Sequence, residues 1–272
     1  MLAKKIIMYS SLTILKKYIQ YLMKASNGKG HGVHSPFVFT FIKEVLNKKP
    51  NNQFIPAIEK RRAQLIADAQ LLNVWDRGAG SRQSNTTQRS VSAIAKAALK
   101  PKKYSQLLHK IIAYYQPTQV LEMGTSLGIT TCYLASANPS AKVVTMEGAP
   151  NVAQMAKQTF LELGLNNIEL KEGDFEETLP SYLNSIETVG VAYVDGNHRY
   201  APTMHYFESL LQKTNDQSIL IFDDIHWSAE MEQAWEEIKN HNAITLTIDL
   251  FFIGLVFVRK AQKEKEHFII RY

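Results

Sequence analysis

The stretch that decides the fold is Gln119-Val-Leu-Glu-Met-Gly-Thr-Ser-Leu-Gly-Ile-Thr-Thr-Cys-Tyr-Leu-Ala135. A short apolar run meets an acid and a turn with two glycines, and a helical pattern follows. The stretch therefore predicts a strand, a ligand-binding loop and a helix. Gly124 and Gly128 let the backbone approach a ligand closely because they carry no Cβ. Glu122, at the carboxyl end of the strand, could hold a positively charged group of that ligand.

A second acid lies at the end of a second predicted strand. Lys142–Met146 predicts another strand, and it ends in Glu147. About twenty residues after the first strand, a doubly wound sheet places the acid that binds the two hydroxyls of a ribose. A nicotinamide cofactor fits less well, because the spacing is Gly124-x-x-x-Gly128 and the G-x-G-x-x-G fingerprint is absent.

The sequence LEMGTSLGITT resembles motif I of the class I S-adenosylmethionine-dependent methyltransferases, and most of all the small-molecule O-methyltransferases of the catechol type. The resemblance runs from Tyr104 to Lys260. It implies an S-adenosylmethionine-dependent O-methyltransferase, with Asp174 near the adenine amine and Phe175 against the adenine ring. The residues that it implies for the cofactor are Glu122, Gly124, Thr125, Ser126, Gly128, Glu147, Gly148, Asp174, Phe175 and Asp195.

Strands and helices are expected to alternate after residue 100, and this pattern predicts an α/β fold with a doubly wound, mostly parallel, Rossmann-like sheet. Two strands near the end of the chain, over 244–250 and 254–258, are expected to form an antiparallel edge hairpin. We predict seven strands in all, over 120–122, 143–147, 168–170, 188–194, 218–222, 244–250 and 254–258. Helices are expected over 104–115, 129–137, 151–163, 202–213 and 229–240.

Acids also end two later strands of the predicted sheet, Asp195 the first and Asp223-Asp224 the second. Three carboxylates in one place would repel one another, so we predict that Asp195, Asp223 and Asp224 bind Mg²⁺ or another divalent cation. The catechol-type enzymes that the chain resembles have Asp, Asp and Asn at these positions, and Asp224 departs from that pattern. His198 stands where metal-dependent relatives carry the general base, so His198 and Asp195 are the predicted catalytic residues.

The charge of the chain is divided unevenly. Its net charge is +6, but residues 1–100 hold 17 Lys and Arg against 4 Asp and Glu, whereas residues 101–272 hold 14 against 21. We predict a basic helical N-terminal segment over 1–100, acting as a cap or lid, and a methyltransferase domain over 101–272. Such asymmetry suggests an acidic partner, which could be anionic lipid, nucleic acid, an acidic acceptor or the acidic domain of the same chain.

Within the N-terminal segment, residues 1–25 predict a basic amphipathic helix that could contact a membrane surface or pack on its own domain or on a second subunit, as in a homodimer. His31 and His34 lie in a glycine-rich turn before a helix that begins near Ser35. Two histidines alone make a poor metal signature, and a lid that faces the substrate is the preferred interpretation. Residues 54–73 predict a further helix.

The octet Val74–Ser81 imitates a cofactor loop through its Gly78-Ala-Gly80 turn. No second strand ending in an acid follows it, so it is interpreted as a loop. Arg77, Arg82 and Arg89 would make this loop basic, able to bind an anionic acceptor.

Two other functions compete with small-molecule methylation. An RNA methyltransferase would use the basic segment, but no recognisable RNA-binding module accompanies the charge, so nucleic acid is not the expected partner. A non-catalytic binding module on the same fold would have lost acids that are all present here. The single cysteine, Cys132, leaves no disulfide framework and favours a reducing cytoplasm. The stretch HGVHSPFVF over 31–39 resembles segments ahead of bacterial methyltransferase domains, and the resemblance to O-methyltransferases implies a bacterial enzyme whose acceptor is a small molecule with a hydroxyl.

Overall fold

The structure is a computed structural model that describes residues 8–50, 52–75 and 86–272. The chain divides into two compact units. Unit 1 joins Met1–Asn47 to Leu183–Tyr272, and unit 2 is the continuous segment Lys48–Tyr182. The predicted division into a cap over 1–100 and a catalytic domain over 101–272 is a functional one, and it stays a prediction.

Unit 2 contains three parallel strands, in the order β3 (Gln119–Met123), β4 (Lys142–Glu147) and β5 (Ile168–Glu172). The inner residues of β3 and β4 are fully buried, and Leu121 lies opposite Val144 in the ladder. Such apolar runs, buried on both faces, are typical of parallel sheets. The helices are α5 (Lys102–Tyr115), α6 (Ile129–Ala137), α7 (Pro150–Glu162) and α8 (Phe175–Asn184).

The first part of unit 2 differs from the prediction. Helix α3 spans Ile55–Ala67, short of the predicted 54–73, and the chain then enters strand β1 (Leu71–Trp75). Strand β2 (Thr86–Ser90) pairs with β1 in an antiparallel ladder, and α4 (Val91–Ala98) follows. The Gly78–Gly80 turn, Arg77 and Arg82 lie outside the described residues. Arg89 lies on β2, opposite Leu72.

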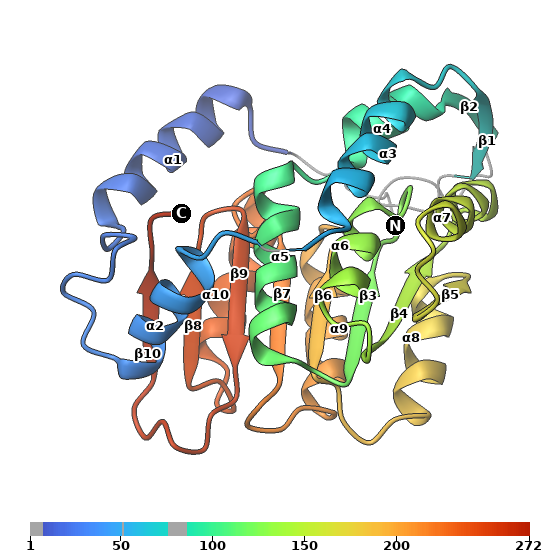
Figure 1. Cartoon of the computed structure of the whole chain (residues 1–272). Coiled ribbons are helices and arrows are strands. Elements are labelled where there is room, and N and C mark those ends of the chain that lie inside the picture. The colour runs from blue at the N-terminus through green and yellow to red at the C-terminus, as the bar shows by residue number, and fades with distance from the viewer. Residues whose placement is uncertain (1–7, 51, 76–85) are drawn as a thin grey trace. The chain divides into compact units, whose positions relative to one another are not determined.

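Unit 1 contains five strands in the order β10-β8-β9-β7-β6, which Figure 1 shows from red to orange. They are β6 (Val191–Val194), β7 (Ile219–Asp223), β8 (Leu246–Asp249), β9 (Ile253–Phe257) and β10 (Glu266–Ile269). Strand β9 is antiparallel to both β7 and β8, whereas β10 is parallel to β8. Helices α9 (Tyr200–Leu211) and α10 (Ala229–Asn240) connect them.

The main sheet therefore has eight strands, and the predicted count of seven is wrong. The missed strand is β10, whose residues Glu266–Ile269 show no clear alternation and are only partly buried. Because β10 pairs outside β8, the predicted β8–β9 hairpin does not form the edge of the sheet. The doubly wound, mostly parallel Rossmann-like fold itself is confirmed.

The N-terminal segment packs within unit 1. Helix α1 (Ser11–Lys24) is capped by Ser10, and Tyr18 and Tyr21 on α1 contact the ring of Phe251 with centroids 5.0 and 5.3 Å away. Helix α2 (Pro36–Phe41) continues into a π-helical turn η1 (Ile42–Leu46), which together match the predicted helix that begins after Ser35.

The glycine-rich turn before α2 has a packing explanation. A Cβ on Gly28 would lie 2.5 Å from the carbonyl oxygen of Arg271, so only glycine fits there. Val38 and Phe41 are fully buried. His31 and His34 are exposed, and no described contact gives them a ligand role.

Candidate functional site

The site in unit 2 begins with the turn between β3 and α6. The backbone N–H groups of Gly124 and Thr125 both donate to the carbonyl of Met146 at 3.1 Å, so the turn is held against the end of β4. Gly128 has φ +82°, and a Cβ there would lie 2.5 Å from the ring of Phe160 on α7. The turn thus requires glycine both for its conformation and for its close packing.

Glu147, the acid predicted to bind a ribose, holds this turn in place. Its Oε2 accepts the N–H of Ser126 at 2.9 Å, and its Oε1 accepts the N–H of Ala149 at 2.9 Å. Burial raises the pKa of Glu147, and the hydrogen bonds from Ala149, Ser126 and Gly148 oppose that rise. A carboxylate has further lone pairs, so these bonds fix its position while leaving it able to accept hydroxyl groups.

Glu122 lies inside the unit and is fully buried. Its Oε2 accepts the hydroxyls of Thr131, on α6, and of Thr145, on β4, the latter at 2.7 Å. Thr145 also shares a hydrogen bond of 2.6 Å with Thr125 in the turn. The acid therefore joins β3, β4 and α6 beneath the turn, a positioning task that the glycine spacing does not reveal.

Ser126 occupies the tip of the same turn with φ +48°. Its hydroxyl is buried, and the part of the chain that the structure describes offers it no hydrogen-bond partner. A buried hydroxyl without a partner is costly in a folded protein. This side chain is thus ready to bond a polar group that enters the turn.

The loop after β5 lies beside the same strand ends. The N–H of Gly173 donates to the carbonyl of Glu147 at 3.0 Å, and a Cβ on Gly148 would lie 3.8 Å from the carbonyl oxygen of Gly173. Asp174 accepts the N–H of Glu176 at 3.2 Å and so caps α8, in which Phe175 is the first residue. Six of the predicted cofactor residues thus gather around the ends of β3, β4 and β5: Gly124, Thr125, Ser126, Glu147, Gly148 and Asp174.

The site in unit 1 is built around Asp195, the residue after β6. Tyr193 donates its hydroxyl to Oδ2 of Asp195 at 3.0 Å, and Nε2 of His198 lies 3.4 Å from Oδ1 of the same carboxylate. The side chains of His198 and Asp195 are 28% and 20% exposed, so both remain accessible to a ligand. The two predicted catalytic residues therefore form a pair.

Asp223 and Asp224 end β7 in the same unit. Asp223 is fully buried, and Asp224 has φ +53° and donates its N–H to the carbonyl of Phe252 at 2.7 Å. Burial raises the pKa of Tyr193 far above its usual range, and the charges of Asp195, Asp223 and Asp224 raise it further. The three acids are therefore electrostatic neighbours of one buried tyrosine.

Whether these residues can hold a divalent cation depends on the chemistry of their side chains and on their positions. Carboxylate oxygens are suitable ligands for Mg²⁺. Within residues 8–50, 52–75 and 86–272, however, no three His, Cys, Asp or Glu side chains are close enough to hold a metal ion. The donor chemistry of Asp195, Asp223 and Asp224 fits, and binding would require these side chains to converge.

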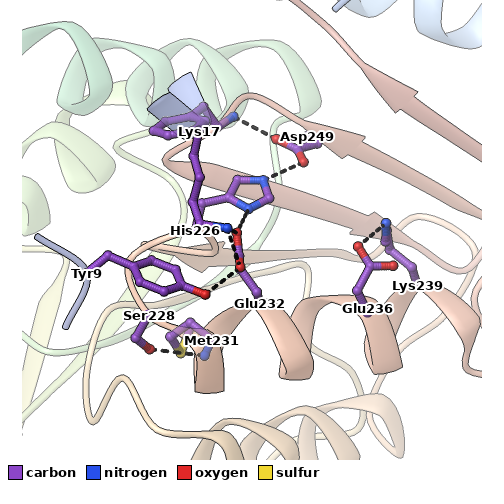
Figure 2. A network of polar contacts seen from close by, with 10 residues as sticks. Tyr9, Lys17, His226, Ser228, Met231, Glu232, Glu236, Lys239 and Asp249 are labelled. Carbon is purple, nitrogen blue, oxygen red and sulfur yellow. Dashed lines mark hydrogen bonds and ion pairs between the residues drawn. The ribbon is translucent and has the colours of Figure 1, made fainter. Parts of the chain in front are cut away.

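His226, two residues beyond Asp224, belongs to a network that the sequence did not predict (Figure 2). It lies between two acids, with Nε2 2.8 Å from Asp249 and Nδ1 3.1 Å from Glu232. Glu232 also accepts the hydroxyl of Tyr9 at 2.8 Å and the ammonium of Lys17 at 2.8 Å. The network joins the N-terminal segment to α10 and β8.

A separate hollow of about 360 Å³ in unit 2 lies at the opposite, amino ends of β4 and β5. The side-chain amide of Asn167 on its wall already donates to the carbonyls of Ala135, Asn138 and Ala141. Because these polar groups already bond one another, they do not indicate a ligand site in this hollow. The residues that line this hollow are Phe54, Ala135, Ser136, Pro139, Gly164, Leu165, Asn166 and Asn167.

Comparison with known proteins agrees with this geometry. Residues 121–225 match a family model described as a methyltransferase domain. O-methyltransferase imqG of Aspergillus flavus is 28% identical over 126 residues, which cover 44% of this chain and 50% of that protein. Catechol O-methyltransferase B of Danio rerio is 29% identical over 126 residues, covering 44% and 47%. The match spans about half the length of these curated relatives.

Solved structures show the same fold at low sequence identity. The O-methyltransferase from Bacillus cereus in complex with SAH has a TM-score of 0.55 and 18% identity, covering 81% of this chain and 97% of that one. Cofactor-bound Rv0187 from MTB has a TM-score of 0.57 and 17% identity, covering 78% and 99%. Residues 121–225, which include the turn at Gly124–Gly128, are thus similar to a methyltransferase domain, and the chain shares the fold of these methyltransferase structures.

Proposed function

We propose that the protein transfers the methyl group of S-adenosylmethionine to a hydroxyl of a small molecule. The observation that carries the cofactor assignment is the turn after β3, where Glu147 bonds the N–H of Ser126 and the Ser126 hydroxyl is buried without a partner among the described residues. A ribose and an amino-acid moiety supply the hydroxyl, amino and carboxylate groups that such a turn can bind. The matches to O-methyltransferases support a hydroxyl acceptor.

Different residues of unit 2 would bind different parts of the cofactor. Glu147 would accept the ribose hydroxyls, and Gly124, Thr125, Ser126 and Gly128 would lie under the amino-acid moiety. Gly148, which carries no Cβ, would let the backbone approach the cofactor closely. Asp174 and Phe175 would contact the adenine amine and ring, and Glu122 would act through the threonines that position the turn.

The bound cofactor supplies an electrophilic methyl group on a positively charged sulfur. Transfer would be an in-line displacement, in which a bond from the acceptor oxygen to the methyl carbon would form as the carbon–sulfur bond breaks and its electron pair goes to the sulfur. His198 takes the hydroxyl proton on a ring nitrogen, and Asp195 orients the imidazole and stabilises its protonated form. Asp195 also accepts from Tyr193, which fixes the carboxylate against β6.

A divalent cation such as Mg²⁺ would be held by Asp195, Asp223 and Asp224. It would lower the pKa of an acceptor hydroxyl and would neutralise carboxylates that otherwise repel one another.

The acceptor is proposed to be an acidic small molecule with a hydroxyl beside a second oxygen. Its charge is inferred from the 17 Lys and Arg against 4 Asp and Glu in residues 1–100. The cytoplasm is the proposed location. Within the described residues, no helix has both the length and the apolar character needed to cross a lipid bilayer.

Calorimetric titration with S-adenosylhomocysteine tests the cofactor assignment. Glu147→Ala is expected to weaken binding by more than about tenfold, because bonds to a charged group contribute about 1.5–3 kcal/mol. Glu187→Ala, which removes an exposed acid of unit 1, is the matched control and should leave the affinity unchanged. Equal affinities of the wild type and Glu147→Ala would contradict the assignment.

A further inference from the structure

The exposed apolar side chains of this protein are concentrated on one helix. Ten large apolar side chains are exposed among the described residues, and five of them lie on α1 or just before it. Leu12, Leu15, Ile19 and Met23 are 79%, 54%, 49% and 75% exposed. Their spacing of i, i+3, i+7 and i+11 places them on one face of the helix. We call these four residues the outer stripe.

The opposite face of α1 is already occupied. Tyr21 is buried against Phe251, and Tyr18 meets the same ring edge-on at 5.0 Å. Lys17 bonds both carboxylate oxygens of Glu232, at 2.9 and 2.8 Å. The helix, dark blue in Figure 1, is therefore fixed to unit 1 through one face. The outer stripe takes no part in that attachment.

The sequence that contains the outer stripe carries charge of a single sign. Residues 1–43 contain seven lysines and no Asp or Glu, and the first acid of the chain is Glu44. Lys16 and Lys24 are exposed on α1 itself. A partner that covers the stripe must therefore combine an apolar interior with a negatively charged surface.

A second copy of the chain fits these requirements poorly. At 1.5 Å per residue a 14-residue helix is about 21 Å long, so a stripe about 10 Å wide offers roughly 200 Å². Stable dimers bury about 800 Å² on each partner. Two copies of α1 would also bring lysines together with no acid on either helix to neutralise them.

We propose that α1 docks on the surface of an anionic lipid bilayer, with the outer stripe inserted among the acyl chains and Lys16 and Lys24 at the headgroups. Helices that lie in the membrane interface have this composition, with an apolar face flanked by lysines. The chain would attach without crossing the bilayer. This attachment brings the enzyme to the surface where anionic or lipid-soluble acceptors collect.

Co-sedimentation of the full chain with vesicles tests the proposal. The wild type is expected to bind vesicles of phosphatidylcholine mixed with phosphatidylglycerol and not vesicles of phosphatidylcholine alone. Binding should fall as salt is raised, because salt screens the lysines from the anionic headgroups. The double variant Leu12→Gln, Ile19→Gln should lose more than about tenfold in partition onto the mixed vesicles, since two apolar anchors are removed.

Leu161→Gln is the matched control, because Leu161 on α7 is 81% exposed, close to the 79% of Leu12. This variant should bind like the wild type. Failure of the wild type to bind mixed vesicles would overturn the proposal, as would equal binding by the double variant. So would a wild-type dimer in gel filtration that the double variant converts to monomer, or an acceptor KM that rises in the double variant without vesicles.

Discussion

At the scale of single residues, the pair of His198 and Asp195 explains how one carboxylate can serve two purposes. Oδ2 accepts the buried hydroxyl of Tyr193, which holds the carboxylate in place, and Oδ1 faces the imidazole at 3.4 Å. An imidazole oriented in this way is a suitable proton acceptor near neutral pH. The loop after β6 thus carries both the proposed base and the carboxylate proposed to orient it.

The role of His198 can be measured with caffeate, a vicinal diol with a carboxylate, as the acceptor. His198→Ala is expected to lower kcat by about 10²–10⁴, the usual contribution of a general base, and leave the affinity for S-adenosylhomocysteine unchanged. Added imidazole should restore part of the rate, which a merely structural role would not permit. His205→Ala, at an exposed position of α9, is the control. A His198→Ala enzyme with wild-type kcat would refute the assignment.

The acids at the end of β7 lead to a second expectation at this scale. Asp223→Asn should abolish turnover of caffeate while leaving binding of S-adenosylhomocysteine in place, because the proposed cation contacts the acceptor. Excess chelator should stop the wild-type reaction, and Mg²⁺ should restore it. Undiminished activity in chelator would remove the cation from the mechanism and leave His198 as the sole activator of the hydroxyl.

At the scale of elements, one carboxylate holds α1 to α10. Burial acts to raise the pKa of Glu232, but hydrogen bonds from His226, Lys17 and Tyr9 outweigh it and lower the pKa to about 2. A depressed carboxylate pKa contributes stability that is fully present above the unfolded value, near 4.5, and is lost as pH falls toward 2. The docking of α1 is therefore expected to weaken in acid.

Urea unfolding of Glu232→Gln tests this contribution. The variant should lose about 2 kcal/mol of unfolding free energy at pH 7, an order-of-magnitude value from the size of the pKa shift. The difference from the wild type should shrink as pH is lowered through the range 4.5 to 2. Glu236→Gln, on the same helix and 61% exposed, should behave like the wild type (Figure 2). A difference that stays constant with pH would contradict the ionic origin of the effect.

At the scale of the whole molecule, the sequence predicted what depends on local patterns. The strand, turn and helix over 119–135 were readable because the apolar run, the glycines and the helical pattern adjoin one another. Strand β10 was not, since Glu266–Ile269 shows no clear alternation and forms a strand by pairing with β8. The turn from α3 into β1 was missed because residues 68–73 continue a helical pattern that the β1–β2 ladder overrides.

The residues of the candidate site also divide into those that the sequence could locate and those that it could not. The positions of Glu147, Asp195 and His198 follow from strand ends, which sequence can locate. The network around His226 could not be foreseen, because Tyr9 and Lys17 are separated from Glu232 by 223 and 215 residues. The buried bonds of Glu122 to Thr131 and Thr145 were also hidden, since threonines in a helix and a strand give no sign of a shared partner.

The two ends of unit 1 meet in one small ladder, and this has a consequence for biosynthesis. Ser26 donates its N–H to Ile269 at 2.8 Å and accepts the N–H of Arg271 at 3.1 Å, while Tyr21 bonds the carbonyl of Ile270. Unit 2 is one continuous segment, so all of its contacts are available once residue 182 has left the ribosome. Helix α1 precedes unit 2 in the chain, but it has no complete docking surface until Ile270 has emerged. The face of α1 that carries Lys17, Tyr18 and Tyr21 therefore stays uncovered from its own synthesis until that point.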